Sequence, residues 1–252
     1  MKVNVDDVEL YYEIHGEGEP IIFSHGWMCD CSVWNSQINF FSKKYKVIVY
    51  DHRGHGKSDK PKANYSIETL SNDLYSIIKE LNLDKVTLVG HSMGGMTALT
   101  FALNHPDKVS KLILVGTSAK MTLLGYIQLW IMMHISSYES FVRGMIDFQH
   151  HKPSEQIKKE SFERAMRTPK FASYECFTEF MKNYDIRERI SQIRIPALIV
   201  VGSKDEATPV EMSQYLNREI KGSKLQIIPD SKHMVMIDKP NELNGIIEEF
   251  IK

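Results

Sequence analysis

The chain has few cysteines, no long apolar run and no excess of charge of either sign. Its 252 residues include 3 cysteines, and 31 lysines and arginines stand against 32 aspartates and glutamates. A chain so close to neutral has no global field that attracts nucleic acid or an anionic membrane surface. We therefore expect neither as a partner, and we expect a small-molecule substrate.

The cysteines indicate a reducing compartment. Cys29 and Cys31 are too close in sequence for an easy disulfide, and a C-x-C spacing without a second cysteine pair is a poor zinc motif. The first residues include Asp6, Asp7 and Glu9, where an export signal needs apolar side chains. We expect a cytoplasmic protein with ordinary half-buried thiols and with no metal ion or other cofactor.

The longest apolar segment in the middle of the chain spans residues 123–135. It is far shorter than the roughly 20 residues that cross a bilayer, and Gln128 and His134 interrupt it. We expect no membrane span here, but a helix that is buried or lines a pocket.

Short apolar runs alternate with amphipathic stretches over the first half of the chain and again from Pro196 onward. This alternation predicts an α/β fold with a mostly parallel central sheet and helices on both faces. Strands are expected at residues 10–14, 20–24, 46–50, 86–89, 112–115, 197–201 and 224–228. Helices are expected at residues 32–41, 66–81, 93–104, 210–220 and 241–251.

The alternation stops between residues 118 and 190. Helical periodicity continues there, with many methionines and aromatic residues but without a convincing strand. We therefore expect one core made of residues 1–117 and 191–252, with a helical insertion at residues 118–190.

A serine lies between a predicted buried strand and a predicted helix. Residues 86–95 read VTLVGHSMGG, so that Gly90 and Gly94 flank Ser92 at a spacing of two. G-x-S-x-G in this context is typical of a nucleophile elbow, in which the glycines let strand and helix pass closely. We expect Ser92 to be a nucleophile; the alternative is an ordinary glycine-rich turn.

A serine hydroxyl needs a base within hydrogen-bond reach and a third group that orients this base. Among the histidines after Ser92, only His233 follows a late strand, in a loop that can return it to the strand ends. Asp205 follows another strand at the carboxyl edge of the sheet, where ligands gather. Asp205 is therefore the candidate for the orienting acid, and Glu206 is the main alternative for this role. A helix-capping role for Asp205 before Pro209 is the non-catalytic alternative.

The oxyanion of an acyl-transfer reaction needs backbone N–H donors. Met93, directly after Ser92 at a helix start, and Trp27, in the His-Gly-Trp loop after an early strand, are the candidates. The Trp27 indole is also a candidate wall of the substrate pocket, and methionines suit an adaptable apolar lining, although core packing is the alternative for each. The candidate lining methionines are Met121, Met132, Met145 and Met234.

Together these motifs resemble the α/β-hydrolase superfamily over nearly the whole chain outside the insertion. The order Ser92, Asp205, His233 is the order of that family. Residues 51–59, DHRGHGKSD, look like its turn after an early strand. The resemblance implies that residues 118–190 form a cap, or lid, over the active site. A serine at position 92 argues against haloalkane dehalogenases and epoxide hydrolases, which have an aspartate there.

The expected activity is cleavage of carboxylic esters with small to medium apolar acyl groups, through an acyl-enzyme, by a monomer or homodimer. The chain looks like the small carboxylesterases and the cofactor-free perhydrolases, and carbon–carbon bond hydrolases share the same triad. A receptor of this fold that binds its ligand and turns over slowly is another alternative. No H-E-x-x-H spacing supports a metal hydrolase.

Overall fold

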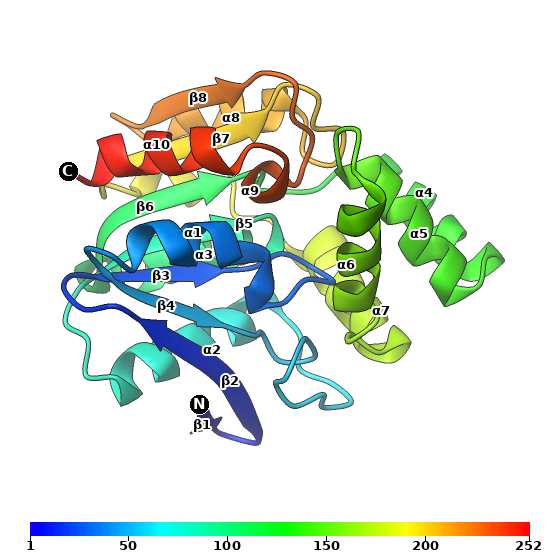
Figure 1. The fold of residues 1–252 in the computed structure, drawn as a ribbon, viewed down its shortest axis with the longest axis horizontal. Coiled ribbons are helices and arrows are strands. Elements are labelled where there is room, and N and C mark those ends of the chain that lie inside the picture. The colour runs from blue at the N-terminus through cyan, green and yellow to red at the C-terminus, as the bar shows by residue number, and fades with distance from the viewer.

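A computed structural model describes residues 1–252, which form one eight-stranded sheet in the order β1-β2-β4-β3-β5-β6-β7-β8 (Figure 1). The pairs β1/β2 and β2/β4 are antiparallel, and all other pairs are parallel. The mostly parallel sheet predicted from the alternation is therefore confirmed. The strands are β1 (Lys2–Val5), β2 (Val8–His15), β3 (Pro20–Ser24), β4 (Lys46–Tyr50), β5 (Val86–His91), β6 (Val109–Val115), β7 (Ala197–Gly202) and β8 (Lys224–Ile228).

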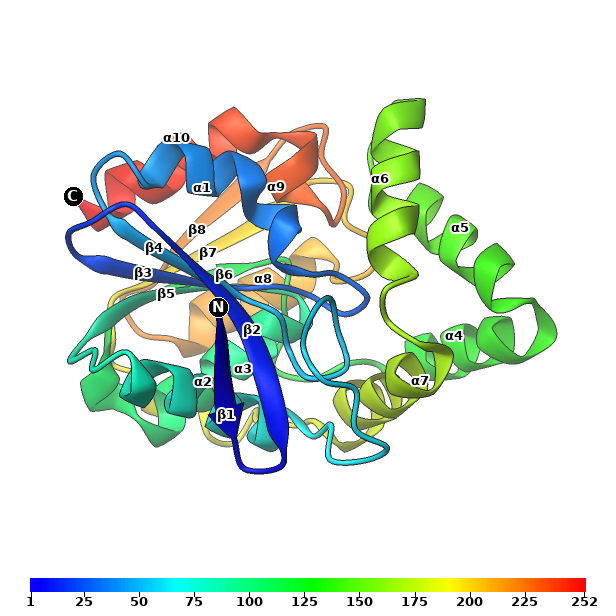
Figure 2. The same cartoon turned by 60° about the horizontal axis from the view of Figure 1, so that its bottom comes forward.

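Helices cover both faces of the sheet (Figures 1 and 2). Side chains alternate between the two faces along each strand, so Val47 and Val49 of β4 pack in one apolar core and Ile48 packs in the other. One face carries α1 (Asn35–Phe41), α9 (Val235–Asp238) and α10 (Pro240–Ile251). The other carries α2 (Ile67–Glu80), α3 (Met93–Asn104) and α8 (Val210–Glu219).

Helix α2 illustrates how the local sequence determines where a helix begins and which face it buries. The Ser66 hydroxyl caps its first turn by accepting a hydrogen bond from the Thr69 N–H at 3.1 Å. Leu70, Leu74 and Ile77 recur at helical spacing and are fully buried against the sheet. The observed bounds lie within one residue of the predicted 66–81 at each end.

Residues between β6 and β7 form the helical insertion, which lies beyond the carboxyl ends of the parallel strands (Figures 1 and 2). Two buried acidic side chains, one in the loop after β3 and one in α9, bind it to the rest of the protein. Asp30 accepts a hydrogen bond of 2.6 Å from Arg167, and Asp238 pairs with His150 at 3.0 Å. The insertion consists mainly of α4 (Leu123–Ile135), α5 (Tyr138–Gln149), α6 (Glu155–Ala165) and α7 (Lys170–Thr178).

The structure corrects some local expectations. Helix α4 forms over the predicted residues and lines a pocket, which was one of its two expected settings, but it is not buried: only Met133 is, whereas Leu123 and Ile135 are 71% and 79% exposed. The predicted helix at residues 32–41 begins as a 3-10 turn, Cys31–Trp34, before α1. Strand β1 was not predicted, and β6 starts three residues before the expected position. The thiols of Cys29 and Cys31 are buried rather than half-buried.

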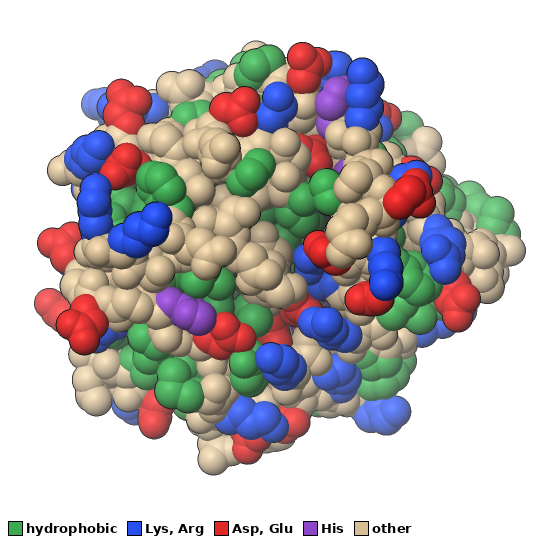
Figure 3. All heavy atoms as spheres, in the orientation of Figure 1, with side chains coloured by type: hydrophobic (Ala, Val, Ile, Leu, Met, Phe, Trp, Pro, Cys, Tyr) green, Lys and Arg blue, Asp and Glu red, His purple; other side chains and the backbone are tan.

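Charges on the surface are mixed. Figure 3 shows lysine and arginine side chains interspersed with aspartate and glutamate over the visible face, in keeping with the balanced composition. The structure has no helix with both the length and the apolar character that a bilayer crossing requires.

Candidate active site

Ser92 occupies the sharp turn between β5 and α3. Its backbone has φ +52° and ψ −119°, a conformation that non-glycine residues rarely adopt. A Cβ on Gly90 would lie 2.4 Å from the Gly94 carbonyl oxygen, and a Cβ on Gly94 would lie 2.3 Å from the Ser24 carbonyl oxygen. Both glycines are therefore required for the close passage of strand and helix, as the motif predicts.

Asp205 and His233 form a buried pair beside this turn. His233 Nδ1 donates to Asp205 Oδ2 at 2.9 Å, and both side chains are at least 97% buried. Asp205 also accepts from the N–H groups of Ala207 and Thr208 and from the Thr208 hydroxyl. Burial opposes ionisation of Asp205, but His233 and these donors outweigh it and hold the pKa of the carboxyl below its usual value. The carboxylate is thus fully hydrogen-bonded and aimed at the imidazole.

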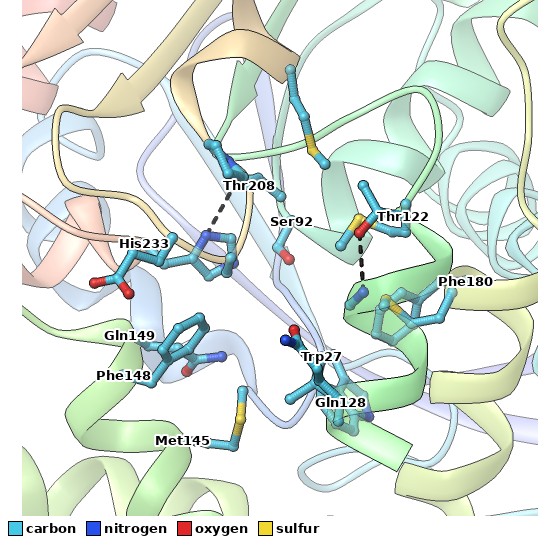
Figure 4. Close-up of a pocket in the computed structure, with 18 of the residues that line it drawn as sticks. Trp27, Ser92, Thr122, Gln128, Met145, Phe148, Gln149, Phe180, Thr208 and His233 are labelled. Atoms are coloured by element: carbon cyan, nitrogen blue, oxygen red, sulfur yellow. Dashed lines mark hydrogen bonds between the residues drawn. The ribbon is translucent and has the colours of Figure 1, made fainter. Parts of the chain in front are cut away.

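The structure brings Ser92 to the same cavity as this pair. Figure 4 shows the Ser92 side chain beside the His233 ring, with both facing the cavity and with Thr208 bonded to the far side of the ring. No direct hydrogen bond joins Ser92 Oγ to His233 Nε2. Such bonds are often long in ligand-free enzymes and tighten when substrate binds.

The rival acids lie away from the imidazole. Glu206 is 62% exposed and pairs with Lys232 at 3.3 Å, and Asp230 is 65% exposed and pairs with Lys204. Asp205 is therefore the only carboxylate in contact with His233.

Two backbone N–H groups near Ser92 have no acceptor within the protein. Met93 is the first residue of α3, so its N–H has no partner in the helix. The Trp27 N–H likewise donates to no protein group. The Trp27 loop passes directly over the serine, because a Cβ on Gly26 would lie 3.2 Å from Ser92 Cβ. Both groups are therefore unpaired donors close to Ser92.

A buried histidine orients the Trp27 N–H. His25 Nε2 accepts a bond from the His52 N–H at 3.0 Å, so its proton is on Nδ1, which donates to the Gly26 oxygen at 2.8 Å. The oxygen of a trans peptide points opposite to the next N–H, so this bond sets the direction of the Trp27 N–H. Burial lowers the pKa of His25 to about 4 and keeps the ring neutral.

His91, the residue directly before Ser92, makes a comparable bond. Its Nε2 donates to the main-chain oxygen of His233 at 3.1 Å, while its Nδ1 is buried without a partner. Burial, reinforced by His233, lowers the pKa of His91 far below the usual value, so the ring stays neutral. No role was predicted for His25 or His91, although His25 lies in the His-Gly-Trp loop and His91 directly precedes Ser92.

A cavity of about 590 Å³ opens in front of Ser92, between the sheet and the helical insertion. Fifteen of its 25 lining residues are hydrophobic. All four candidate methionines, Met121, Met132, Met145 and Met234, line it. The Trp27 indole forms one wall, and its Nε1 donates to the Ser173 oxygen of α7 at 3.0 Å. A cavity of this size and polarity is typical of a small-molecule site.

Known proteins are similar to this chain over nearly its whole length. A family model described as alpha/beta hydrolase fold matches residues 19–240. The 3-oxoadipate enol-lactonase 2 of Acinetobacter baylyi is 28% identical over 265 residues, covering 99% of this chain and 96% of the enol-lactonase.

Two solved structures superpose closely. An esterase from Exiguobacterium antarcticum is 27% identical with a TM-score of 0.93, covering 98% of this chain and 97% of the esterase. An N-acyl homoserine lactone degrading enzyme is 30% identical with a TM-score of 0.90, covering 99% of this chain and 100% of its own.

Proposed function

Because this chain belongs to the α/β-hydrolase fold family, we propose that it hydrolyses carboxylic esters with Ser92 as nucleophile, His233 as general base and Asp205 as the orienting acid. The observation that carries the proposal is the buried Asp205–His233 bond of 2.9 Å, beside a strained serine at the head of an apolar cavity. An oriented base next to such a serine has a chemical purpose in acyl transfer and none in simple packing.

In the proposed reaction, His233 Nε2 takes the Ser92 proton as Oγ attacks the ester carbonyl. The N–H groups of Trp27 and Met93 bind the oxyanion of the tetrahedral intermediate. The bond to the alcohol oxygen then breaks, and His233 returns the proton to the leaving alcohol. Water attacks the acyl-enzyme by the same route, releases the acid and restores Ser92. Asp205 stays ionised throughout and stabilises the imidazolium.

We propose that residues 118–190 act as a cap on a core of residues 1–117 and 191–252. The cavity supports this assignment, since α4 and α5 supply one side of its lining, and the segments that follow β5 and β8 supply Ser92 and His233. The many methionine and aromatic side chains suit a flexible apolar acyl group of small to medium size.

A lactone is a cyclic ester and fits the same chemistry. Two of the similar proteins are named for lactone cleavage, the enol-lactonase and the N-acyl homoserine lactone degrading enzyme. We therefore include lactones among the candidate substrates, because ring opening needs the same nucleophile, base and oxyanion donors.

The test is hydrolysis of p-nitrophenyl esters of increasing acyl length and of a matching lactone series, with a chelator present. We expect multiple turnovers, and we expect Ser92→Ala to lower kcat by several powers of ten. Full turnover by Ser92→Ala would refute the assignment. A single burst without further turnover would favour a slow receptor or a carbon–carbon bond hydrolase.

A further inference from the structure

The polar side chains of the cavity wall fall into two groups. Near the sheet, Thr208 is bonded to Asp205, and the His91, Ser92 and His233 side chains lie around the reacting position. On the insertion side, the Thr122 hydroxyl caps α4 by accepting from the Gly125 N–H at 3.1 Å. The remaining polar side chains of the cavity lining are the carboxamides of Gln128 and Gln149 and the carboxylate of Glu206.

The two carboxamides reach the cavity from different helices. Gln128 is on α4 and Gln149 is the last residue of α5. Figure 4 shows both side chains extending into the space in front of Ser92 and His233, with no hydrogen bond from either one to the residues drawn. The main-chain oxygen of Gln149 accepts a hydrogen bond from the Met234 N–H at 3.2 Å. This bond holds Gln149 next to the loop that contains His233.

The surroundings of these amides are apolar. Met145, Phe148 and Phe180 line the cavity between and beside them. Gln149 is half-buried and Gln128 is exposed, so an alkyl chain that fills the cavity displaces water from Gln149 and from the cavity side of Gln128. It offers neither carboxamide a hydrogen bond in return. A chain with a neutral donor and acceptor pairs with them, since each carboxamide has two N–H donors and one acceptor oxygen.

The charges of the cavity argue against an anionic substrate. No lysine or arginine lines it, and its one charged lining side chain outside the catalytic set is the carboxylate of Glu206. A carboxylate on the substrate thus meets no cation along the lining, and Glu206, which pairs with Lys232 at 3.3 Å, offers it no attraction, which disfavours its binding in a largely apolar space.

We propose that the substrate is an uncharged ester or lactone with a second, neutral hydrogen-bonding group beyond the scissile carbonyl, and that Gln128 and Gln149 bind this group. An amide is the best match because it donates and accepts at once. The inference rests on the ester hydrolase function proposed above, and it adds the charge and polarity of the substrate.

The experiment compares three p-nitrophenyl esters of matched chain length: the hexanoate, the N-acetyl-β-alaninate and the adipate monoester. Their kcat/KM values, corrected for uncatalysed hydrolysis, are measured with the wild type, Gln128→Leu, Gln149→Leu and the control Gln214→Leu. Gln214 is an exposed residue of α8 outside the cavity. Leucine keeps the approximate volume and removes the amide.

We expect the ratio of amide ester to hexanoate to fall about tenfold in one or both cavity variants, the loss of one hydrogen bond. The ratio stays unchanged in Gln214→Leu, and the adipate monoester is the poorest substrate. Unchanged ratios in both cavity variants, or a preference for the adipate monoester, would overturn the inference.

Binding separates this inference from the proposed function. The affinities of the same three esters are measured by calorimetry in Ser92→Ala, with and without each glutamine substitution. An affinity ratio that depends on the glutamines supports the inference even if the wild type shows no serine-dependent turnover, a result that overturns the proposed function alone. An affinity ratio that is unchanged by the glutamine substitutions overturns the inference even if hydrolysis is rapid.

Discussion

His91 Nε2 donates a hydrogen bond to the main-chain oxygen of His233 over 3.1 Å, and the centroids of the two rings are 4.6 Å apart. His91 ends β5 and directly precedes Ser92, whereas His233 lies in the loop after β8. The bond therefore ties the strand of the proposed nucleophile to the loop of the proposed base. Acyl transfer depends on the relative geometry of these two groups.

Replacement of His91 by phenylalanine keeps a ring of similar size and removes the N–H donor. We expect kcat for a good ester substrate to fall about ten- to a hundredfold with little change in KM, because a misplaced base affects the transition state more than substrate binding. Steady-state kinetics measure both constants. The control is His105→Phe, since His105 stacks on Tyr75 away from the site. An unchanged kcat would show that the bond does not position His233.

Asparagine at position 205 keeps the shape of the side chain but removes its charge. We expect Asp205→Asn to lower kcat on the order of 10³- to 10⁴-fold, because the amide neither stabilises the imidazolium nor maintains the required tautomer. Glu206→Gln, one residue along, is expected to leave kcat within about twofold, since Glu206 is exposed and does not contact His233. The reverse ranking of the two variants would assign the orienting role to Glu206.

The buried histidine His25 makes stability depend on pH. Its pKa is lowered to about 4 in the folded protein, because burial disfavours the imidazolium, whereas an unfolded chain has a histidine pKa near 6.5. Between these values the unfolded chain binds a proton that the folded protein does not. The free energy of unfolding therefore decreases as the pH falls from about 6.5 to about 4, by about 3 kcal/mol for His25 alone.

Urea denaturation across this pH range measures the effect. We expect His25→Asn to show a shallower pH dependence than the wild type, because asparagine does not titrate. His105→Asn, at a half-buried position away from His25, keeps the wild-type slope. Equal slopes for His25→Asn and the wild type would mean that another group carries the pH dependence.

Two glycine-to-alanine substitutions are expected to change stability in opposite directions. At Gly94 the new Cβ would lie 2.3 Å from a main-chain oxygen that cannot move freely, so we expect a loss of about 1–3 kcal/mol. At Gly144, inside α5, nothing lies within 4 Å of the new Cβ, so we expect a gain of up to about 1 kcal/mol. Urea denaturation measures both. Equal effects at the two positions would contradict the close-passage argument for the elbow.

Much of the core and of the proposed catalytic set could be predicted because the signals are local. Apolar runs located β3 and β4 to the residue, since buried parallel strands are continuous in hydrophobicity. The bounds of β8 were also predicted to the residue, although most of this edge strand is exposed. The flanking glycines predicted the tight turn at Ser92, since their spacing reflects a steric requirement of that turn. By contrast, β6 was predicted to begin too late because Ser110 and Lys111 interrupt its apolar run. Strand β1 was missed because four residues at a sheet edge form too short a pattern.

Other features depend on which elements meet in space. Periodicity described α4 as apolar on nearly all faces, but only the packing decided that one side lines the cavity and the other is exposed. The choice between Asp205 and Glu206 rested on which carboxylate the turn after β7 directs toward His233.

The sequence by itself therefore determined the fold class, the tight turn at Ser92 and the order of the candidate residues, because each depends on short segments of the chain. Tertiary structure decided the contacts of His25 and His91 and the position of Gln128 and Gln149 in a cavity without a cation. These features depend on side chains that are distant in sequence and close in space. The spacing of residues along the chain does not determine which surfaces face each other in the folded protein.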